Sequence, residues 1–164
     1  MRASFGRPDP VYRFSPVRLA QKVRRLGFRG ARDLWTAQRA LLRARGALRR
    51  RPTGQLLRPL SAPPSSVAPV AHETLRSLER MAIAVDRASD YGLFVPTCLV
   101  RALALEDLAR REGAEAALVR VGVRRDENGF EAHAWLEIEG RIVGDTLENV
   151  TSFTVLEDFS GLPG

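Results

Sequence analysis

The chain has 164 residues, 45% of them hydrophobic, which is enough for one domain with a core but not for two large domains. No stretch approaches the roughly 18 uninterrupted apolar residues of a membrane helix, so no membrane span is expected. One cysteine and two histidines are too few for a disulfide framework or a structural zinc site, and no cofactor is expected. Because the start also lacks the apolar run of a secretory signal, the sequence predicts a cytoplasmic protein.

The net charge of +7 is divided unevenly along the chain. Residues 1–60 hold 16 of the 26 basic residues and two of the 19 acidic residues, and so carry +14. Residues 61–164 hold the other charged residues and carry −7. This contrast predicts two regions of different character, the first of them strongly basic.

Apolar residues at helical spacing predict that the basic region is helical. A shorter helix around residues 17–26 is expected to end at Gly27, and a longer helix follows it. One face of the longer helix carries an apolar stripe, with arginines on the opposite face. The stripe consists of Leu34, Trp35, Leu41, Leu42 and Leu48. We expect this stripe to pack against the rest of the protein.

A run rich in Pro and Ser follows the basic region. Its composition supports neither a helix nor a strand, so it predicts a linker or a surface crossover. The expected organisation is therefore a basic helical region over residues 1–60, a linker over residues 61–69 and a second domain over residues 70–164.

The second domain begins with two predicted helices and continues with strands. The first helix runs from residue 72 to about Gly92, and the second begins at Cys98 behind the N-cap Thr97 and ends near Gly113. The apolar pattern then changes to period two, which is typical of antiparallel strands. The strands are expected at residues 116–125, 131–138 and 141–145. This order of elements predicts an α+β fold.

The only cysteine of the chain, Cys98, lies in the first turn of a predicted helix. Free backbone N–H groups and the helix dipole favour a thiolate there, so the position is that of a candidate nucleophile. A cysteine nucleophile needs a base, and the base needs a third group to orient it. His133, in the middle of a predicted strand, is the candidate base, whereas His72 lies in a polar helix start and is expected to be exposed.

The loop after the His133 strand decides whether Asp145 can orient that histidine. A three-residue loop over residues 138–140 would place Asp145 directly opposite His133. A two-residue loop over residues 139–140 would place Asp145 opposite Ala134, on the wrong face. The three-residue loop also brings opposite charges together across the strands, so we expect that register and Asp145 as the orienting residue. The alternatives are Glu131 and Glu137.

Helix-start cysteine, strand histidine and next-strand aspartate occur in the order shared by papain-like and transglutaminase-like folds. The stretches TCLVRALAL and VRVGVRRDENGFEAHAWLEIEGRIVGD further resemble the B2 proteins of lasso peptide biosynthesis. These are transglutaminase-like cysteine peptidases that remove the leader from a ribosomally made precursor, and the resemblance covers about residues 70–150. It implies a papain-like or transglutaminase-like core with Cys98 as the nucleophile, His133 as the general base and Asp145 as its orienting residue.

The resemblance also implies partners. The precursor's leader region would be the substrate, and a separate leader-binding protein of the B1 type and a separate ATP-dependent cyclase would act beside the peptidase. The sequence contains no phosphate-binding loop, which agrees with that division of tasks. The basic region either leaves its arginines in solvent or binds an acidic leader or leader-bound partner. The residues favoured for such binding are Arg39, Arg43, Arg49, Arg50 and Arg51.

Two other functions remain open at this point. The same three residues can pass a thioester to an amine instead of water, as in transglutaminase-like acyltransferases. Alternatively, the chain is a non-catalytic module whose basic region binds an acidic peptide or a nucleic acid. No recognised DNA- or RNA-binding motif accompanies the basic region, so no nucleic-acid partner is expected.

Overall fold

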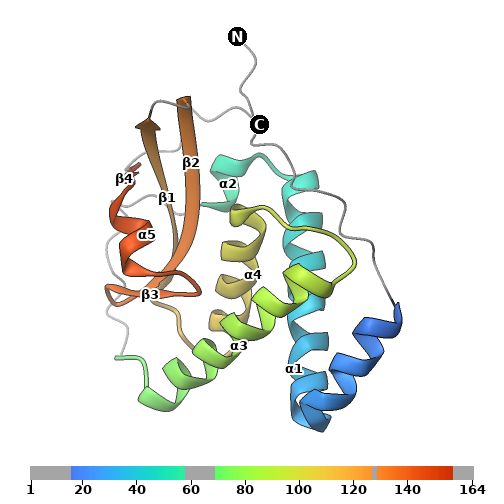
Figure 1. Cartoon of the computed structure of the whole chain (residues 1–164). Helices are drawn as coiled ribbons and strands as arrows, with labels where there is room; N and C mark the ends of the chain where they lie inside the picture. The colour runs from blue at the N-terminus through green and yellow to red at the C-terminus, as the bar shows by residue number, and fades with distance from the viewer. Residues whose placement is uncertain (1–15, 58–68, 127–128, 157–164) are drawn as a thin grey trace.

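The computed structural model describes residues 16–57, 69–126 and 129–156. Helices cover one face of an antiparallel sheet, which confirms the predicted α+β fold (Figure 1). The predicted linker lies outside the described residues, except for Pro69. Within the described part of the chain, no helix is long and apolar enough to cross a membrane.

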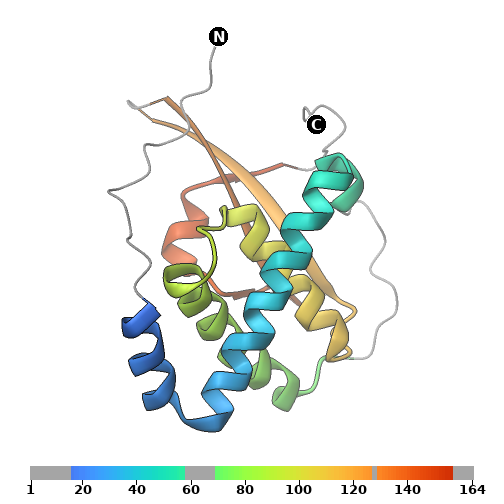
Figure 2. The same ribbon diagram turned by 90° about the vertical axis from the view of Figure 1, so that its right-hand side faces the viewer.

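Helix α1 (Pro16–Arg50) is interrupted at Gly27, whose φ of 68° and ψ of 177° are not helical, as the sequence predicts. The predicted apolar stripe is only partly correct, because Trp35 is 64% exposed and Leu42 is 43% exposed. The buried face instead consists of Ala37, Gln38, Ala40, Leu41 and Ala44. This face is mostly alanine and lies against α3 and α4, which run beside α1 in Figure 2. The large side chains of Trp35 and Leu42 lie largely outside the contact.

Helix α2 (Thr53–Leu56) is one short turn, and the two predicted helices of the second domain follow it as α3 (His72–Tyr91) and α4 (Cys98–Arg111). Thr97 caps α4 as predicted, since its side-chain oxygen accepts a hydrogen bond from the Val100 N–H at 3.4 Å. Helix α4 is the central helix, because it contacts α1, α3 and two strands of the sheet. The start of α4 is therefore held by the main hydrophobic core.

The sheet has four strands in the order β3-β2-β1-β4, all antiparallel to their neighbours. They are β1 (Ala117–Asp126), β2 (Gly129–Ile138), β3 (Arg141–Val143) and β4 (Thr154–Val155). Alternate residues of β2 from Ala134 to Ile138 face the helices and belong to the main core. The predicted strand positions are confirmed, apart from the shorter end of β3.

The predicted register between β2 and β3 is wrong. Ile138 pairs with Arg141, so the loop is the two-residue turn Glu139–Gly140. Both turn residues have positive φ, 51° and 77°, which is the backbone of a type I′ hairpin turn. The charge pairing that favoured the longer loop does not form, because Glu137 pairs with Arg120 of β1 instead.

Helix α5 (Leu147–Thr151) and strand β4 follow β3 and were not predicted. The Thr146 side chain caps α5 by accepting a hydrogen bond from the Asn149 N–H at 3.2 Å. This segment lies against the face of the sheet opposite the helices. There Trp135, Val150 and Phe153 form a second, small hydrophobic cluster.

Candidate active site

Cys98 lies beside the edge of β2, at the point where the pairing of β2 with β3 ends. Strand β3 pairs with β2 only as far as Leu136. Ala134, two residues earlier in β2, donates its N–H to the Cys98 sulfur. The Leu99 N–H in the first turn of α4 donates to the same sulfur. The Cys98 residue is partly exposed, and backbone N–H groups of the helix and the strand hold its sulfur.

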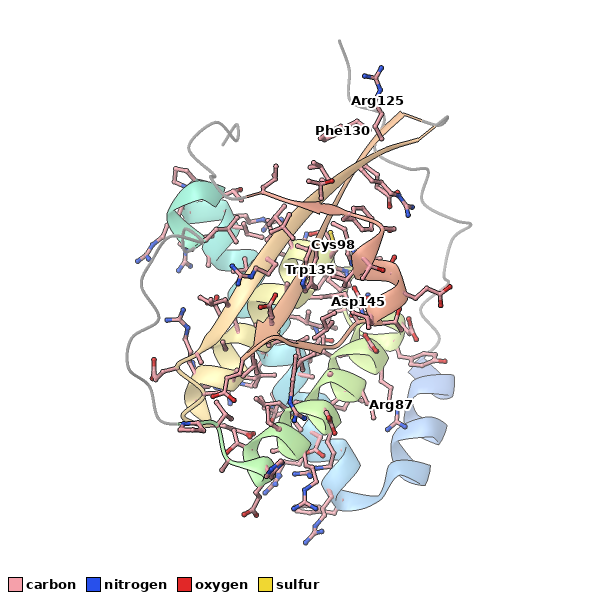
Figure 3. The ribbon with its side chains drawn as sticks, turned by 90° about the vertical axis from the view of Figure 1, so that its left-hand side faces the viewer. Arg87, Cys98, Arg125, Phe130, Trp135 and Asp145 are labelled. Atoms are coloured by element: carbon pink, nitrogen blue, oxygen red, sulfur yellow. The ribbon has the colours of Figure 1, made fainter. Side chains whose placement is uncertain are left out.

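His133 lies in β2 next to Ala134, and its side chain hydrogen-bonds to the Cys98 thiol. The Nε2 atom of the same ring lies 2.5 Å from Oδ2 of Asp145. Because Nε2 faces the carboxylate, Nδ1 is the nitrogen left for the sulfur. The three side chains therefore form a continuous hydrogen-bonded series, and Figure 3 shows Cys98 and Asp145 close together beside β2.

Asp145 reaches His133 although the predicted register is wrong. The two-residue turn would have placed Asp145 opposite Ala134 in a continued strand, but β3 ends at Val143. Gly144 then adopts a φ of 78°, which turns the chain and releases Asp145 from the alternation of the strand. A Cβ atom on Gly144 would also lie 2.6 Å from Leu105 Cδ1, so a larger residue here would have to displace that side chain of α4.

The surroundings favour the charged forms of Cys98 and His133. Burial raises the pKa of the Cys98 thiol, but hydrogen bonds from His133 and from backbone N–H groups outweigh it and hold the pKa below its usual range. The hydrogen bond with Cys98 raises the pKa of His133 to about 8, against the effect of burial and with further help from Asp145. The arrangement thus favours a thiolate beside an imidazolium.

Asp145 is held as a carboxylate by several donors. Burial raises its pKa, yet hydrogen bonds from His133, from the Asn149 side chain and from the Thr146 N–H lower it to below its usual range. The Asn149 amide lies 3.0 Å from Oδ1 of Asp145, and the Thr146 N–H lies 2.7 Å from the same oxygen. The imidazole of His133 is therefore oriented by a carboxylate that is itself fixed by the start of α5.

Aromatic side chains cover the outer side of His133. Its ring stacks on Trp135 at a centroid distance of 6.1 Å and lies 5.1 Å from the ring of Phe153. Gly122, directly opposite His133 on β1, leaves room for both, because a Cβ atom there would lie 2.8 Å from the Phe153 Cβ. The imidazole is thus packed against aromatic rings on one face, while its ring nitrogens bind Cys98 and Asp145.

Sequence reasoning missed Asn149, Phe153, Gly144 and Gly122. Asn149 and Phe153 lie in the segment that carried no recognised pattern. Thr146 as an N-cap residue and Glu148 in the first turn were signals of a helix start, but the helix has only five residues. Trp135 was placed correctly on the same face as His133 by strand alternation.

The alternative partners of His133 bind elsewhere. Glu131 pairs with Arg124 at 2.7 Å, and Glu137 pairs with Arg120 at 3.2 Å. Both carboxylates are therefore bonded to arginines of β1. His72 is exposed at the start of α3, as the sequence predicts.

The arginines predicted to bind the leader differ in their contacts. Arg39, Arg49, Arg50 and Arg51 are exposed. Arg43 is also exposed, but it donates to Asp107 of α4 at 2.6 Å and so helps to hold α1 on α4. Arg45 of the same helix lies 4.4 Å above the ring of Phe94, in the loop that precedes Cys98. The later half of α1 thus contacts the segment that leads into the site.

Cys98, His133 and Asp145 line a single cavity together with Arg101 and Gly144. Across the described ranges, no group of three or more His, Cys, Asp or Glu side chains is arranged to hold a metal ion. The cavity offers the thiol of Cys98, the imidazole of His133 and the carboxylate of Asp145 in hydrogen-bonded series. These groups suit nucleophilic attack on an acyl carbon followed by proton delivery to the leaving group.

A family model described as the transglutaminase-like superfamily matches residues 33–158. The match extends from the second half of α1 past β4, and the chain belongs to this superfamily. Domains of this kind are typically cysteine-dependent catalytic domains, and the superfamily includes cysteine peptidases and acyltransferases. No curated protein and no solved structure was found to match the chain.

Proposed function

We propose that the chain is a cysteine peptidase that removes the leader from a lasso peptide precursor at the junction of leader and core. The observation that carries the proposal is the hydrogen-bonded series from Cys98 through His133 to Asp145 at an accessible sheet edge. The peptidase activity is the part that this geometry supports. The lasso precursor as substrate rests on the resemblance of residues 97–105 and 119–145 to the B2 leader peptidases.

In this proposal the Cys98 thiolate attacks the scissile carbonyl, and the His133 imidazolium gives its proton to the departing amine of the core. Water then hydrolyses the thioester, with His133 as the base, and releases the leader. Asp145 keeps the imidazole oriented and stabilises its positive charge. The Cys98 N–H belongs to the free donors of the first turn of α4, and we assign it to the developing oxyanion.

The proposal includes partners. A leader-binding protein of the B1 type would present the leader, and an ATP-dependent cyclase would close the ring of the released core. The reaction would take place in the cytoplasm, where an accessible free thiol remains reduced.

The direct test is to incubate the purified chain with short peptides encoded near its gene, alone and with any small leader-binding protein encoded there. Separate leader and core masses would support the peptidase. A leader joined to an added primary amine would instead support the acyltransferase, which the superfamily also contains. If both the precursor and the amine remain unchanged in the presence of the partner, the enzymatic proposal is wrong.

The reactivity of Cys98 gives a prediction that needs no precursor. Iodoacetamide should alkylate Cys98 with a midpoint at lower pH than for an ordinary thiol, because only the thiolate reacts and the pKa of Cys98 is lowered. Peptide cleavage also needs the imidazolium, so it should decline as the pH rises above about 8, the pKa of His133. Alkylation should not decline there. A midpoint at or above that of glutathione, measured in parallel, would contradict the proposed thiolate.

The basic region gives a second prediction. Replacing Arg49, Arg50 and Arg51 with Gln should raise KM for the precursor, because exposed arginines attract an acidic leader or partner mainly during association. Turnover at saturation should change little, and the dependence of kcat/KM on salt should become flatter. The matched control is Arg76, Arg80 and Arg87 to Gln on α3, which removes the same charge elsewhere. Equal effects of the two triple variants would show that these arginines act only through net charge.

A further inference from the structure

Among the described residues, one edge of β2 is unpaired next to the Cys98 sulfur. In the described part of the chain, β3 covers this edge only from Ile138 to Leu136. The Leu156 N–H donates to the Val121 carbonyl at 2.8 Å, so Val121 directs its backbone groups towards β4. Ala134 is the partner of Val121 across β1 and β2, and it therefore directs its N–H and C=O away from β1. The bond from the Ala134 N–H to Cys98 agrees with this direction.

The same alternation fixes the direction of the next residues. The pairing of β1 with β2 has one register from end to end, without a bulge. Ala132 and Phe130, two and four residues before Ala134, therefore present their N–H and C=O groups to the same open edge. Both side chains are exposed, Phe130 by 70%, and Figure 3 shows Phe130 at the projecting end of the hairpin. The open edge runs from the reacting sulfur to the tip of this hairpin.

We propose that the backbone of the substrate peptide pairs with this edge at Ala132 and Phe130, as an added strand in the place that β3 leaves at Gly144. The proposal rests on the proposed function and names the form of its substrate, an extended peptide segment beside the scissile bond. The scissile carbonyl must approach the Cys98 sulfur next to Ala134. At about 3.3 Å per residue, the substrate residues on one side of the scissile bond then lie beside Ala132 and Phe130. Main-chain pairing of this kind gives affinity with little dependence on side chains.

Proline substitutions can test the hydrogen bonds of this edge without disturbing the pairing of β1 with β2. Ala132→Pro removes one N–H from the open edge and no hydrogen bond between β1 and β2, and proline is tolerated at such edge positions. Arg125→Pro is the matched control. Arg125 pairs with Phe130 and directs its N–H to the opposite edge of the same hairpin. The two variants therefore introduce the same residue into neighbouring strands but alter different edges.

Three alkylating reagents that react with Cys98 test whether this edge binds a peptide. Iodoacetamide carries no peptide, acetyl-trialanine chloromethyl ketone carries a peptide on the acyl side, and iodoacetyl-trialanine amide carries one on the leaving-group side. For each protein, the rate with each peptide reagent is divided by the rate with iodoacetamide, which corrects for changes in the thiol itself. Ala132→Pro should lower this ratio by about threefold to tenfold for one of the two peptide reagents, as expected for one lost backbone hydrogen bond. Arg125→Pro should leave both ratios at the wild-type value.

The affected reagent also reports the direction of the added strand. Loss on the acyl side means that the substrate runs parallel to β2, and loss on the leaving-group side means that it runs antiparallel. As a second measurement on the wild-type protein, N-methylation of successive alanines in that reagent should lower the rate at alternate positions only. If both ratios are unchanged in Ala132→Pro, or if N-methylation has no alternating effect, the edge does not bind the substrate. Slow alkylation by iodoacetamide in the wild-type protein would instead refute the proposed function itself.

Discussion

Replacing Cys98 with Ala is expected to reduce cleavage of the precursor to the background rate. The change removes the nucleophile, and in another triad hydrolase loss of the nucleophile lowers kcat about a millionfold. The fold should be unaffected, because the first turn of α4 is still capped by Thr97 and packed in the main core. Cleavage is measured by mass spectrometry of the precursor, and folding by the far-ultraviolet circular dichroism and the melting temperature of the variant.

The matched control for Cys98→Ala is Cys98→Ser, which keeps a hydroxyl group of nearly the same size. Its oxygen is far less ionised than sulfur at neutral pH, so this variant should also be almost inactive. A Cys98→Ala variant that is folded and cleaves at a rate near that of the wild type would show that the reaction does not proceed through this thiol.

Replacing His133 with Ala is expected to be about as damaging as the loss of Cys98. Without His133 the burial of the thiol is no longer offset by its hydrogen bond, so the pKa of Cys98 should rise. The leaving amine would also lack its proton donor. Two measurements follow from this, the cleavage rate and the pH dependence of iodoacetamide alkylation, whose midpoint should move to higher pH.

His72→Ala is the control for His133→Ala, because His72 is the other histidine and is exposed at the start of α3. This variant should keep the wild-type cleavage rate and the wild-type alkylation profile. Equal losses in the two histidine variants would remove the basis for assigning the base to His133.

Much of the fold could be predicted because its signals are local. The cap at Thr97, the period-two strands and the break at Gly27 each depend on residues that are neighbours in the sequence. The buried face of α1 was less accessible to prediction. Helical spacing identified the large apolar residues, but packing selected the alanines beside them, so Trp35 is exposed.

The register of β3 shows why the candidate site could be predicted only in part. Cross-strand charge pairs contribute only about 0.2–1 kcal/mol each, and they favoured the longer loop. The two-residue turn requires Glu139 to adopt a φ of 51°, which is uncommon for a residue other than glycine. Asp145 still meets His133, but through the turn at Gly144 and not through strand pairing. The expected contact therefore forms by a route that the sequence pattern did not indicate.

The five residues of α5 were not predictable from periodicity, because a helix this short is held by its surroundings. Its Asn149 fixes Asp145, and Phe153 behind it packs on His133. These contacts depend on the whole sheet being formed. For that reason the residues that support the site were less visible in the sequence than Cys98 and His133.

The residues of the candidate site are attached to two hydrophobic clusters of very different size. Cys98 lies with the main core around α4, whereas Asp145 is attached through α5 to the small cluster of Trp135, Val150 and Phe153. Protein segments with few buried contacts open at a lower free-energy cost than the core and exchange their amide hydrogens faster. Opening of the small cluster would separate the carboxylate from the imidazole while the thiol-bearing helix stays folded. We therefore expect the contact between Asp145 and His133 to be lost under milder conditions than the fold around α4.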